Sequence, residues 1–427
     1  MNNIDKIKKS RNPWKWIPTL YFAEGLPNVA VAAISIVMFK RLGLSNEATT
    51  FFASLITLPW VIKPIWSPFV DLIRTKRWWV ILMQILMTFS FLGVALSIET
   101  HWFVTLSLIF FAILAFFSAT HDIAADGYYM LELNSHKQSL FVGIRSTFYR
   151  LSTIAGKGLL VMLAGLLETM TRNVHRSWSI TFLVLAIIFG LLTIYHYFFM
   201  PKAEKDVPSN EHSAHELMQD FVKTFTTFFK KPGALPAICF MFFYRFPEAL
   251  LSSVGTLFLL DPPSQGGLGM STQEFGLATG TVGIIGLTLG GILGGFLAAK
   301  WGLKKSLWPM VLLITVPDVL YVLLSIFQIQ NFAVINAFIF IEQFGYGFGF
   351  TAYMLYLIYY AQGESQTSHY AICTGFMALS LLVPGLFAGA LQEMVGYTTY
   401  FIIVIASCSI TFAVSAWIKI DPEFGKK

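Results

Sequence analysis

The chain has 427 residues, of which 56% are hydrophobic and only 12% are charged, and its formal net charge is +6. A soluble protein usually carries about 25% charged residues, so this composition argues against a soluble enzyme, a nucleic-acid-binding protein or a disordered scaffold. One membrane span needs about 20 apolar residues, which leaves room for about twelve spans. The excess of bases fits the cytoplasmic loops of an inner-membrane protein.

Apolar stretches predict six helices in each half of the chain. Those of the first half are Trp14–Phe39, Ala48–Val70, Trp78–Ile98, Trp102–Met130, Leu140–Leu167 and Trp178–Met200. Those of the second half are Leu235–Leu260, Glu274–Ala299, Leu307–Phe327, Phe332–Tyr360, Tyr370–Leu391 and Tyr397–Ile420. The expected fold is therefore an all-α membrane protein with twelve transmembrane helices.

A polar segment divides the two sets of helices. We expect a six-helix bundle over residues 1–200, a cytoplasmic linker over 201–231 and a second six-helix bundle over 232–427. The linker ends in an amphipathic stretch that is expected to lie on the inner leaflet. With both ends inside, the cytoplasmic segments hold twenty of the Lys and Arg residues and the outer loops hold four. This bias predicts cytoplasmic termini, and we expect a monomer in a bacterial inner membrane.

An internal repeat supports this halving. The loop after the second expected helix reads SPFVDLIRTKR from Ser67, and the loop after the eighth reads GFLAAKWGLKK from Gly295. Both resemble the loop signature of the major facilitator superfamily, in which an acid precedes a basic cluster, although the first copy has Ser67 in place of the glycine and the second lacks the acid. In the first copy Asp71, Arg74 and Arg77 are predicted to form a conformational latch.

Charged residues inside membrane-spanning helices are costly and are usually functional or paired. Eleven occur here: Glu24, Lys63, Asp122, Asp126, Arg145, Arg150, Lys157, Arg245, Glu248, Asp318 and Glu342. At 1.5 Å per residue, Glu24 and Glu342 lie about 15 Å from their helix ends, near the midplane. Midplane charges from both halves are typical of a transporter cavity between two repeats.

The fourth and fifth expected helices form a hairpin in which Asp126 should face Arg145 and Asp122 should lie within a turn of Arg150. One interpretation is a lock between two helices. The other is a cluster in which Arg150 and Lys63 bind an anionic substrate group while Asp122 or Asp126 takes and releases a proton.

Polar and aromatic neighbours accompany these charges. Tyr21 and Asn28 share a stripe with Glu24, and Pro27 is expected to break this first helix locally. Trp60 accompanies Lys63, while Gln343 and Tyr346 accompany Glu342. Aromatic rings beside carboxylates and amides are a common way to bind sugars. Arg245 and Glu248 are three residues apart and could simply neutralise each other.

The three cysteines, Cys239, Cys373 and Cys408, lie in apolar stretches. Their spacing argues against disulfides and metal clusters. No catalytic or nucleotide-binding pattern is present, so we expect no enzyme activity, no metal and no cofactor.

Several segments resemble the muropeptide permease (AmpG-like) and acetyl-CoA transporter branch of the superfamily. These segments are YFAEGLP from Tyr21, LPWVIKPIWSP from Leu58, SATHDIAADGY from Ser118, YRFPEAL from Tyr244 and IEQFGYGFG from Ile341. The resemblance implies proton-coupled import of an anhydromuropeptide or a related amino-sugar oligosaccharide across the inner membrane.

The resemblance also suggests roles for individual residues. It gives Asp122 and Asp126 as the proton-coupling pair, and we expect Glu24, an added acid at the midplane, to be a third proton-coupling residue. The expected substrate-binding residues are Tyr21, Asn28, Trp60, Lys63, Arg145, Arg150, Tyr244, Arg245, Glu248, Glu342, Gln343 and Tyr346. The substrate could instead be another glycan disaccharide, acetyl-CoA or a siderophore, and a membrane receptor that binds without transporting is an alternative of another class.

Overall fold

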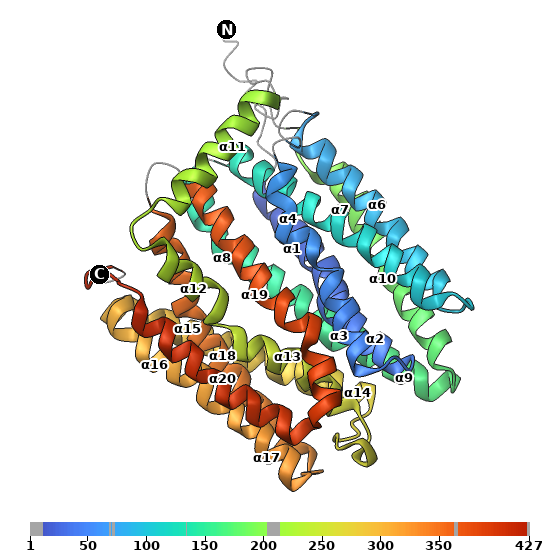
Figure 1. Cartoon of the computed structure of the whole chain (residues 1–427). Coiled ribbons are helices and arrows are strands. Elements are labelled where there is room, and N and C mark those ends of the chain that lie inside the picture. The colour runs from blue at the N-terminus through green and yellow to red at the C-terminus, as the bar shows by residue number, and fades with distance from the viewer. Residues whose placement is uncertain are drawn as a thin grey trace.

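The computed structural model describes residues 12–67, 70, 73–133, 135–202, 214–362 and 366–424, and within these ranges every regular element is a helix (Figure 1). Eleven helices of the described residues are long and apolar enough to cross a membrane. The predicted all-α class is therefore confirmed. We call residues up to 202 the N-terminal half and residues from 214 the C-terminal half.

The N-terminal half contains nine α-helices among the described residues. They are α1 (Ile17–Val29), α2 (Ser35–Arg41), α3 (Asn46–Leu55), α4 (Leu58–Ile62), α6 (Lys76–Ser97), α7 (Phe103–Glu132), α8 (Ser135–Thr153), α9 (Val161–Thr171) and α10 (Val174–Phe199). A π-helical segment, Ala30–Ile34, joins α1 to α2, and a second, Ile154–Leu160, joins α8 to α9.

The C-terminal half begins with the amphipathic helix α11 (Ala214–Phe229). It continues with α12 (Ala234–Phe243), α13 (Phe246–Leu260), α14 (Thr272–Leu277), α15 (Gly283–Trp301), α16 (Leu303–Thr315), α17 (Val319–Phe327), α18 (Phe332–Ala361), α19 (Gln366–Val395) and α20 (Tyr397–Trp417). A π-helical segment, Ala278–Val282, joins α14 to α15.

The predicted continuous helix over Ala48–Val70 is wrong. The chain leaves helical geometry after Leu55, resumes it as α4 and then tightens into a 3₁₀ turn at Lys63–Ile65. Pro59 and Pro64 stand at the starts of these two pieces, where a missing N–H is tolerated. Conversely, α1 runs through Pro27, so the break expected there is a π-helical turn just after it.

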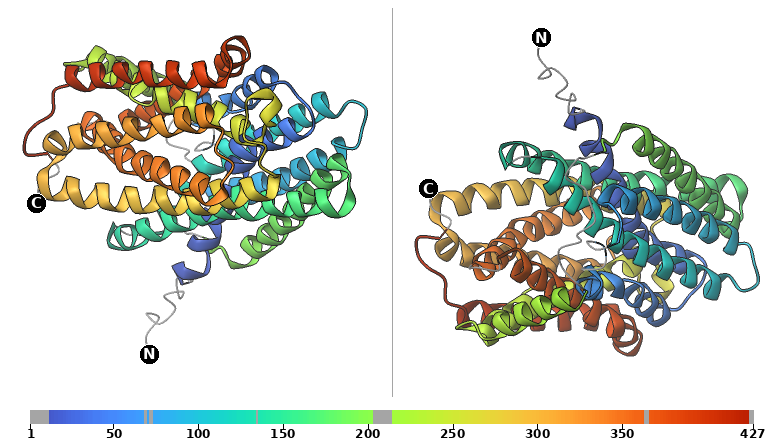
Figure 2. Two further views of the ribbon diagram at one scale, coloured as in Figure 1. Left: turned by 90° about the horizontal axis from the view of Figure 1, so that it is seen from below. Right: turned by 90° about the horizontal axis from the view of Figure 1, so that it is seen from above.

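The two halves lie side by side, with the blue-to-green helices on one side and the yellow-to-red helices on the other (Figure 2). The start of α1, the C-terminal end of α20 and helix α11 lie toward one end of the molecule, which we call the terminus face (Figure 1). The tips of α9, α14 and α17 lie at the other end, the opposite face (Figure 1).

The buried apolar side chains show how the halves meet. One cluster includes residues from both halves, such as Val161 and Ala164 on α9 with Phe275 on α14. Two further clusters each belong to a single half: one contains Trp16 and Met200, and the other contains Phe228 and Ile418. Trp16 and Ile418, in the two single-half clusters, lie near the first and last described residues of the chain. The shared core therefore joins the halves toward the opposite face, while each half has its own core toward the terminus face.

Candidate functional site

Two acids on α7 form the centre of a charged cluster in the N-terminal half. The carboxylate of Asp126 accepts hydrogen bonds from Arg145 of α8 at 2.6 Å and from the hydroxyl of Tyr21 on α1 at 3.1 Å. The Arg145 guanidinium lies 4.3 Å from the ring centroid of Tyr21 and 5.2 Å from that of Tyr129. The pairing of Asp126 with Arg145, expected from the hairpin register, is present.

Asp122, one turn earlier on α7, meets the broken second span. Its Oδ2 accepts a hydrogen bond from the indole N–H of Trp60 at 3.1 Å and lies 3.7 Å from the ammonium of Lys63. Its other oxygen is buried without a hydrogen-bond partner. Trp60 lies on α4 and Lys63 begins the 3₁₀ turn that follows Ile62. Both partners of Asp122 therefore come from one short segment that packs against α7.

The expected contact between Asp122 and Arg150 is not present, because the partners of Asp122 come from α4 and the following turn. Arg150 is exposed and reaches toward α15, where its Nη2 lies 3.8 Å from the position that a Cβ on Gly291 would take. Arg150 thus extends toward the other half.

The N-terminal cluster is open rather than sealed. The side chain of Asp126 is 44% exposed and those of Lys63 and Arg145 are 32% and 28% exposed. Such exposure is typical of a charge that faces a water-filled cavity between helices. Glu24 of α1 is buried at 7% exposure, and its Oε2 has no hydrogen-bond partner.

The charged pair of the C-terminal half is closed. Arg245 stands where α12 ends and α13 begins, and it donates a 3.2 Å hydrogen bond to Glu248 and another to the hydroxyl of Tyr346. Their side chains are only 5% and 9% exposed. The rings of Tyr346, Phe350 and Tyr353 surround the guanidinium. Arg245 and Glu248 therefore neutralise each other inside an aromatic enclosure.

Glu342 of α18 lies at a small cavity of about 50 Å³ that Lys157 of the N-terminal half also lines. The amide of Gln343 donates to the two Glu342 oxygens at 2.9 and 3.2 Å. Asp318, between α16 and α17, is 2% exposed, and the thiol of Cys408 lies 3.9 Å from its carboxylate.

The remaining predicted residues lie elsewhere. The Tyr244 hydroxyl donates to the Gly349 carbonyl at 3.0 Å and its ring stacks on Tyr353, so this side chain joins α12 to α18. Asn28 is half-buried on α1.

The predicted latch is described only in part. Asp71 lies outside the described residues. Arg74 is exposed, with a left-handed φ of 69°. Arg77 donates to the carbonyls of Tyr197 and Met200 at 2.6 and 3.1 Å, and it thereby caps the C-terminal end of α10.

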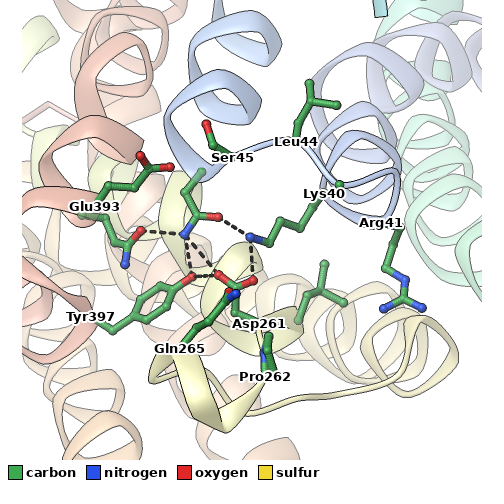
Figure 3. Close-up of a pocket in the computed structure, with 13 residues that line it drawn as sticks. Lys40, Arg41, Leu44, Ser45, Asp261, Pro262, Gln265, Glu393 and Tyr397 are labelled. Carbon is green, nitrogen blue, oxygen red and sulfur yellow. Dashed lines mark hydrogen bonds and ion pairs between the residues drawn. The ribbon is translucent and has the colours of Figure 1, made fainter. Parts of the chain in front are cut away.

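A polar network that sequence reasoning missed joins the halves at the opposite face (Figure 3). The amide N–H of Asn46 donates to Gln392 at 2.6 Å, to Tyr397 at 2.9 Å and to Asp261 at 3.1 Å. Lys40 adds an ion pair to Asp261 at 2.5 Å. These side chains line a cavity of about 610 Å³. No local sequence pattern predicts this network, because Asn46 and Gln392 are far apart in the sequence.

The two halves also contact each other along α9 and α14, and we call this line of contacts the seam. The carboxylate of Glu168 pairs with Arg41 at 2.8 Å and accepts a hydrogen bond from Thr272 of the C-terminal half at 2.9 Å. Further in, a Cβ placed on Gly280 would lie 2.3 Å from the Cα of Gly158. The backbones of the π-helical segments Ile154–Leu160 and Ala278–Val282 therefore pack directly against each other.

A buried polar chain inside the N-terminal half was also missed. Gln84 of α6 lies 3.0 Å from the ring nitrogens of both His121 and His196, and His196 lies 3.0 Å from the hydroxyl of Thr19. This chain ties α1, α6, α7 and α10 together behind the charged cluster. Within the ranges that the structure describes, no group of three His, Cys, Asp or Glu residues is arranged to hold a metal ion.

Comparisons with known proteins agree with this architecture. The family model described as Major Facilitator Superfamily matches residues 20–262. The chain is 26% identical over 402 residues to the Putative transporter AmpG 4 of Rickettsia felis, with 90% of this chain and 91% of that protein covered. It is 23% identical over 396 residues to the anhydromuropeptide permease of Escherichia coli K12, with 91% and 76% covered.

Solved structures show the same fold. A POT family transporter in complex with 5-aminolevulinic acid has a TM-score of 0.73 at 14% identity, with 93% of this chain and 94% of that chain covered. A D-xylose–proton symporter has a TM-score of 0.69 at 13% identity, with 95% and 99% covered. At these identities the likeness concerns the fold alone.

The family model covers more than half of the chain, the helical arrangement is that of solved transporters, and charged residues meet between helices where lipid would exclude them. The protein is a multi-pass membrane transporter and not an enzyme, and it belongs to the major facilitator superfamily.

Proposed function

We propose that this protein is a proton-coupled symporter that imports an anhydromuropeptide or a related amino-sugar oligosaccharide by alternating access. In this proposal it is a monomer in the bacterial inner membrane, its terminus face is cytoplasmic, and the linker over 201–231 tethers two six-helix bundles. The observation that carries the proposal is the exposed, ion-paired carboxylate of Asp126 inside a membrane-spanning helix. The similarity to a relative named anhydromuropeptide permease supports the substrate class.

The proposed coupling is a competition for Arg145. In the absence of substrate, Arg145 neutralises Asp126. A carboxylate of the substrate peptide would draw the guanidinium away, because Arg binds carboxylates through two parallel hydrogen bonds. Asp126 would then have lost its counter-charge while two other acids, Asp122 and Glu24, remain nearby, and this favours binding of a proton. Substrate and proton would therefore be bound together.

Asp122 offers a second acid on the same helix face. Its partners Trp60 and Lys63 supply a flat indole surface and a cation, which suit a sugar ring that carries an anionic group. Glu24 lies close by on α1 and is held by no hydrogen bond at Oε2, so it is a candidate for a further proton site.

The conformation supports alternating access. In this structure the halves are joined at the opposite face by the Asn46 network and by the Glu168–Thr272 hydrogen bond. The N-terminal cluster is exposed at the same time. Import would require the contacts at the opposite face to break while contacts at the terminus face form. The contacts at the opposite face would then form again as the terminus face opens.

The test is uptake in proteoliposomes with an imposed pH gradient, using a labelled anhydromuropeptide. We expect uptake against a concentration gradient in the wild type. Asp126→Asn should abolish this uphill uptake but retain exchange of internal for external substrate, because exchange needs no net proton movement. Asp421→Asn, at an exposed position near the C-terminus, is the matched control.

Three results would contradict the proposal. Uphill uptake by Asp126→Asn equal to that of the wild type would refute the coupling role. Exclusive uptake of acetyl-CoA or a siderophore would refute the substrate class. Absence of exchange for every compound tested, despite binding, would favour a receptor.

A further inference from the structure

The buried acids of the C-terminal half lack enough bases of their own. Among the described residues, Glu248, Asp318 and Glu342 lie in its interior at 7%, 2% and 4% exposure. Arg245 is the base paired with Glu248. An ionised carboxylate in such a place is costly unless a cation accompanies it. Glu342 therefore needs a counter-charge from another element or a proton.

The available cation belongs to the other half. Lys157, in the π-helical segment Ile154–Leu160, lines the same cavity of about 50 Å³ as Glu342. No ion pair within 4.0 Å joins the described Lys157 to Glu248 or Glu342. The hydroxyl-bearing side chains Ser252, Thr256, Thr279 and Tyr321 complete the polar lining. A polar space of this size holds a few water molecules, which can connect the ammonium to the carboxylate.

The approach of Lys157 depends on how the halves are joined. Its neighbour Gly158 packs against Gly280, where a Cβ would lie 2.3 Å from the Gly158 Cα and 2.5 Å from the Lys157 carbonyl carbon. Toward the opposite face the same seam continues through Gly165 and Gln273 to the Glu168–Thr272 hydrogen bond. Lys157 therefore faces Glu342 only while this seam is closed.

The other charged and titratable groups around Glu342 do not supply it with a counter-charge. Tyr346 shares its helix, and Glu248 on α13 is neutralised by Arg245. Tyr321 on α17 lines the same cavity, and Asp318 lies beside Cys408 of α20. Of the described residues named here, Lys157 alone is a cation that is not already paired with an acid.

We propose that Lys157 and Glu342 form a proton-binding site shared between the two halves. With the seam closed, the Lys157 ammonium and the Glu342 carboxylate neutralise each other across the cavity. When the seam opens, Lys157 moves away with the N-terminal half, and the Glu342 carboxylate binds one proton to form the neutral acid. Closing the seam returns Lys157, and Glu342 releases that proton.

This site deepens the proposed function and rests on it, because it supplies a second point at which proton binding and conformation are linked. Protonation accompanies opening toward the opposite face, and deprotonation accompanies opening toward the terminus face. That order drives net import. It is separate from the Asp126 site, which responds to substrate.

The experiment measures the opposite-face opening directly. Nitroxide labels are attached to Arg172→Cys and Ser264→Cys, which replace exposed residues of different halves, and the distance distribution is recorded between pH 5 and 9. The chain without these two substitutions controls for labelling of the native cysteines. We expect the long-distance population to rise by about tenfold as the pH falls.

Substitutions then locate the responsible group. Glu342→Gln should populate the long distance at every pH, because it mimics the protonated acid. Lys157→Met should also remove the pH dependence, since Glu342 would stay protonated in both states. The double variant should lack the pH dependence but melt at a higher temperature than either single variant. Glu342→Asp should restore it in part, and Glu99→Gln, at an exposed loop position, should behave as the wild type.

A wild-type pH dependence in a folded Glu342→Gln protein would overturn the proposal. So would a double variant that melts below both single variants, because the two charges would then not depend on each other. The Asp126→Asn variant separates this proposal from the proposed function: it should lose uphill uptake and keep the pH-dependent distance. Loss of that dependence in Asp126→Asn alone would assign it to the N-terminal cluster and refute the shared site.

Discussion

The ammonium of Lys40 lies 2.5 Å from the carboxylate of Asp261, and the two residues belong to different halves of the transporter. Asp261 also accepts hydrogen bonds from Asn46 and Tyr397. This group of side chains closes the opposite face with charge as well as with apolar packing, so its strength should govern how readily that face opens.

Breaking this ion pair should open the opposite face. Removing one partner of a buried pair costs about 3–5 kcal/mol, because the other charge is left uncompensated. In a chain that carries Thr256→Cys, an impermeant thiol reagent is added on the side of the opposite face. Lys40→Met and Asp261→Asn should each increase the rate at which this thiol reacts. The double variant should react more slowly than Asp261→Asn alone. Equal rates in the wild type and both single variants would show that the pair does not hold the face closed.

A methyl group at the glycine contact should prevent closure. Gly280→Ala would place a Cβ 2.3 Å from the Gly158 Cα, and overpacking of this kind costs about 1–3 kcal/mol. We expect substrate uptake to fall by about tenfold while the protein remains folded. Gly295→Ala is the matched control because its added Cβ meets nothing within 4 Å. Uptake that falls equally in both variants would argue against a steric effect at the seam.

Arg145 should not be replaceable by lysine. Its guanidinium donates to Asp126 while it stacks over the rings of Tyr21 and Tyr129, and a lysine ammonium lacks the planar surface for this arrangement. Arg145→Lys should lower kcat/KM for uptake by about tenfold. Arg176→Lys, at an exposed position in the first turn of α10, should change it little. Normal kinetics in Arg145→Lys would mean that positive charge alone suffices.

Arg77 should contribute to stability. Its two hydrogen bonds to the carbonyls of Tyr197 and Met200 satisfy groups that the end of α10 leaves without partners. Arg77→Gln should lower the free energy of unfolding by about 1–3 kcal/mol, visible as a lower Tm in detergent. Arg74→Gln, at an exposed neighbour, should have a smaller effect. A larger effect at Arg74 would contradict the capping role.

Much of the fold follows from local sequence. Long apolar runs predict spans whose edges agree with the helices, as for the predicted Tyr397–Ile420 and the observed α20. The pairing of Asp126 with Arg145 was also within reach, because two helices joined by a short loop have a fixed register. These features depend on residues that are close together in the chain.

The breaks within the membrane spans and the contacts between the two halves could not be predicted from the sequence, because both depend on the tertiary structure. The prolines near Lys63 and Arg245 were visible, but a proline can either kink a helix or start a new one, and here α4 and α13 start anew. Asp261 and Gln392, which accept hydrogen bonds from Asn46, lie more than 200 residues away from it. Lys40 directly follows the first expected helix and is one of the four bases assigned to the outer loops, although it contacts Asp261. Nothing in one sequence reveals such distant contacts.

The cavity in Figure 3 has walls from both halves, since Asn46 and Asp261 line it together. It can therefore exist only while the opposite face is closed. A small polar compound that fills it would hold the transporter in this one state. In the proposed orientation such an inhibitor would act from outside the cell, without entering the cytoplasm and without competing for the proposed substrate site around Asp126.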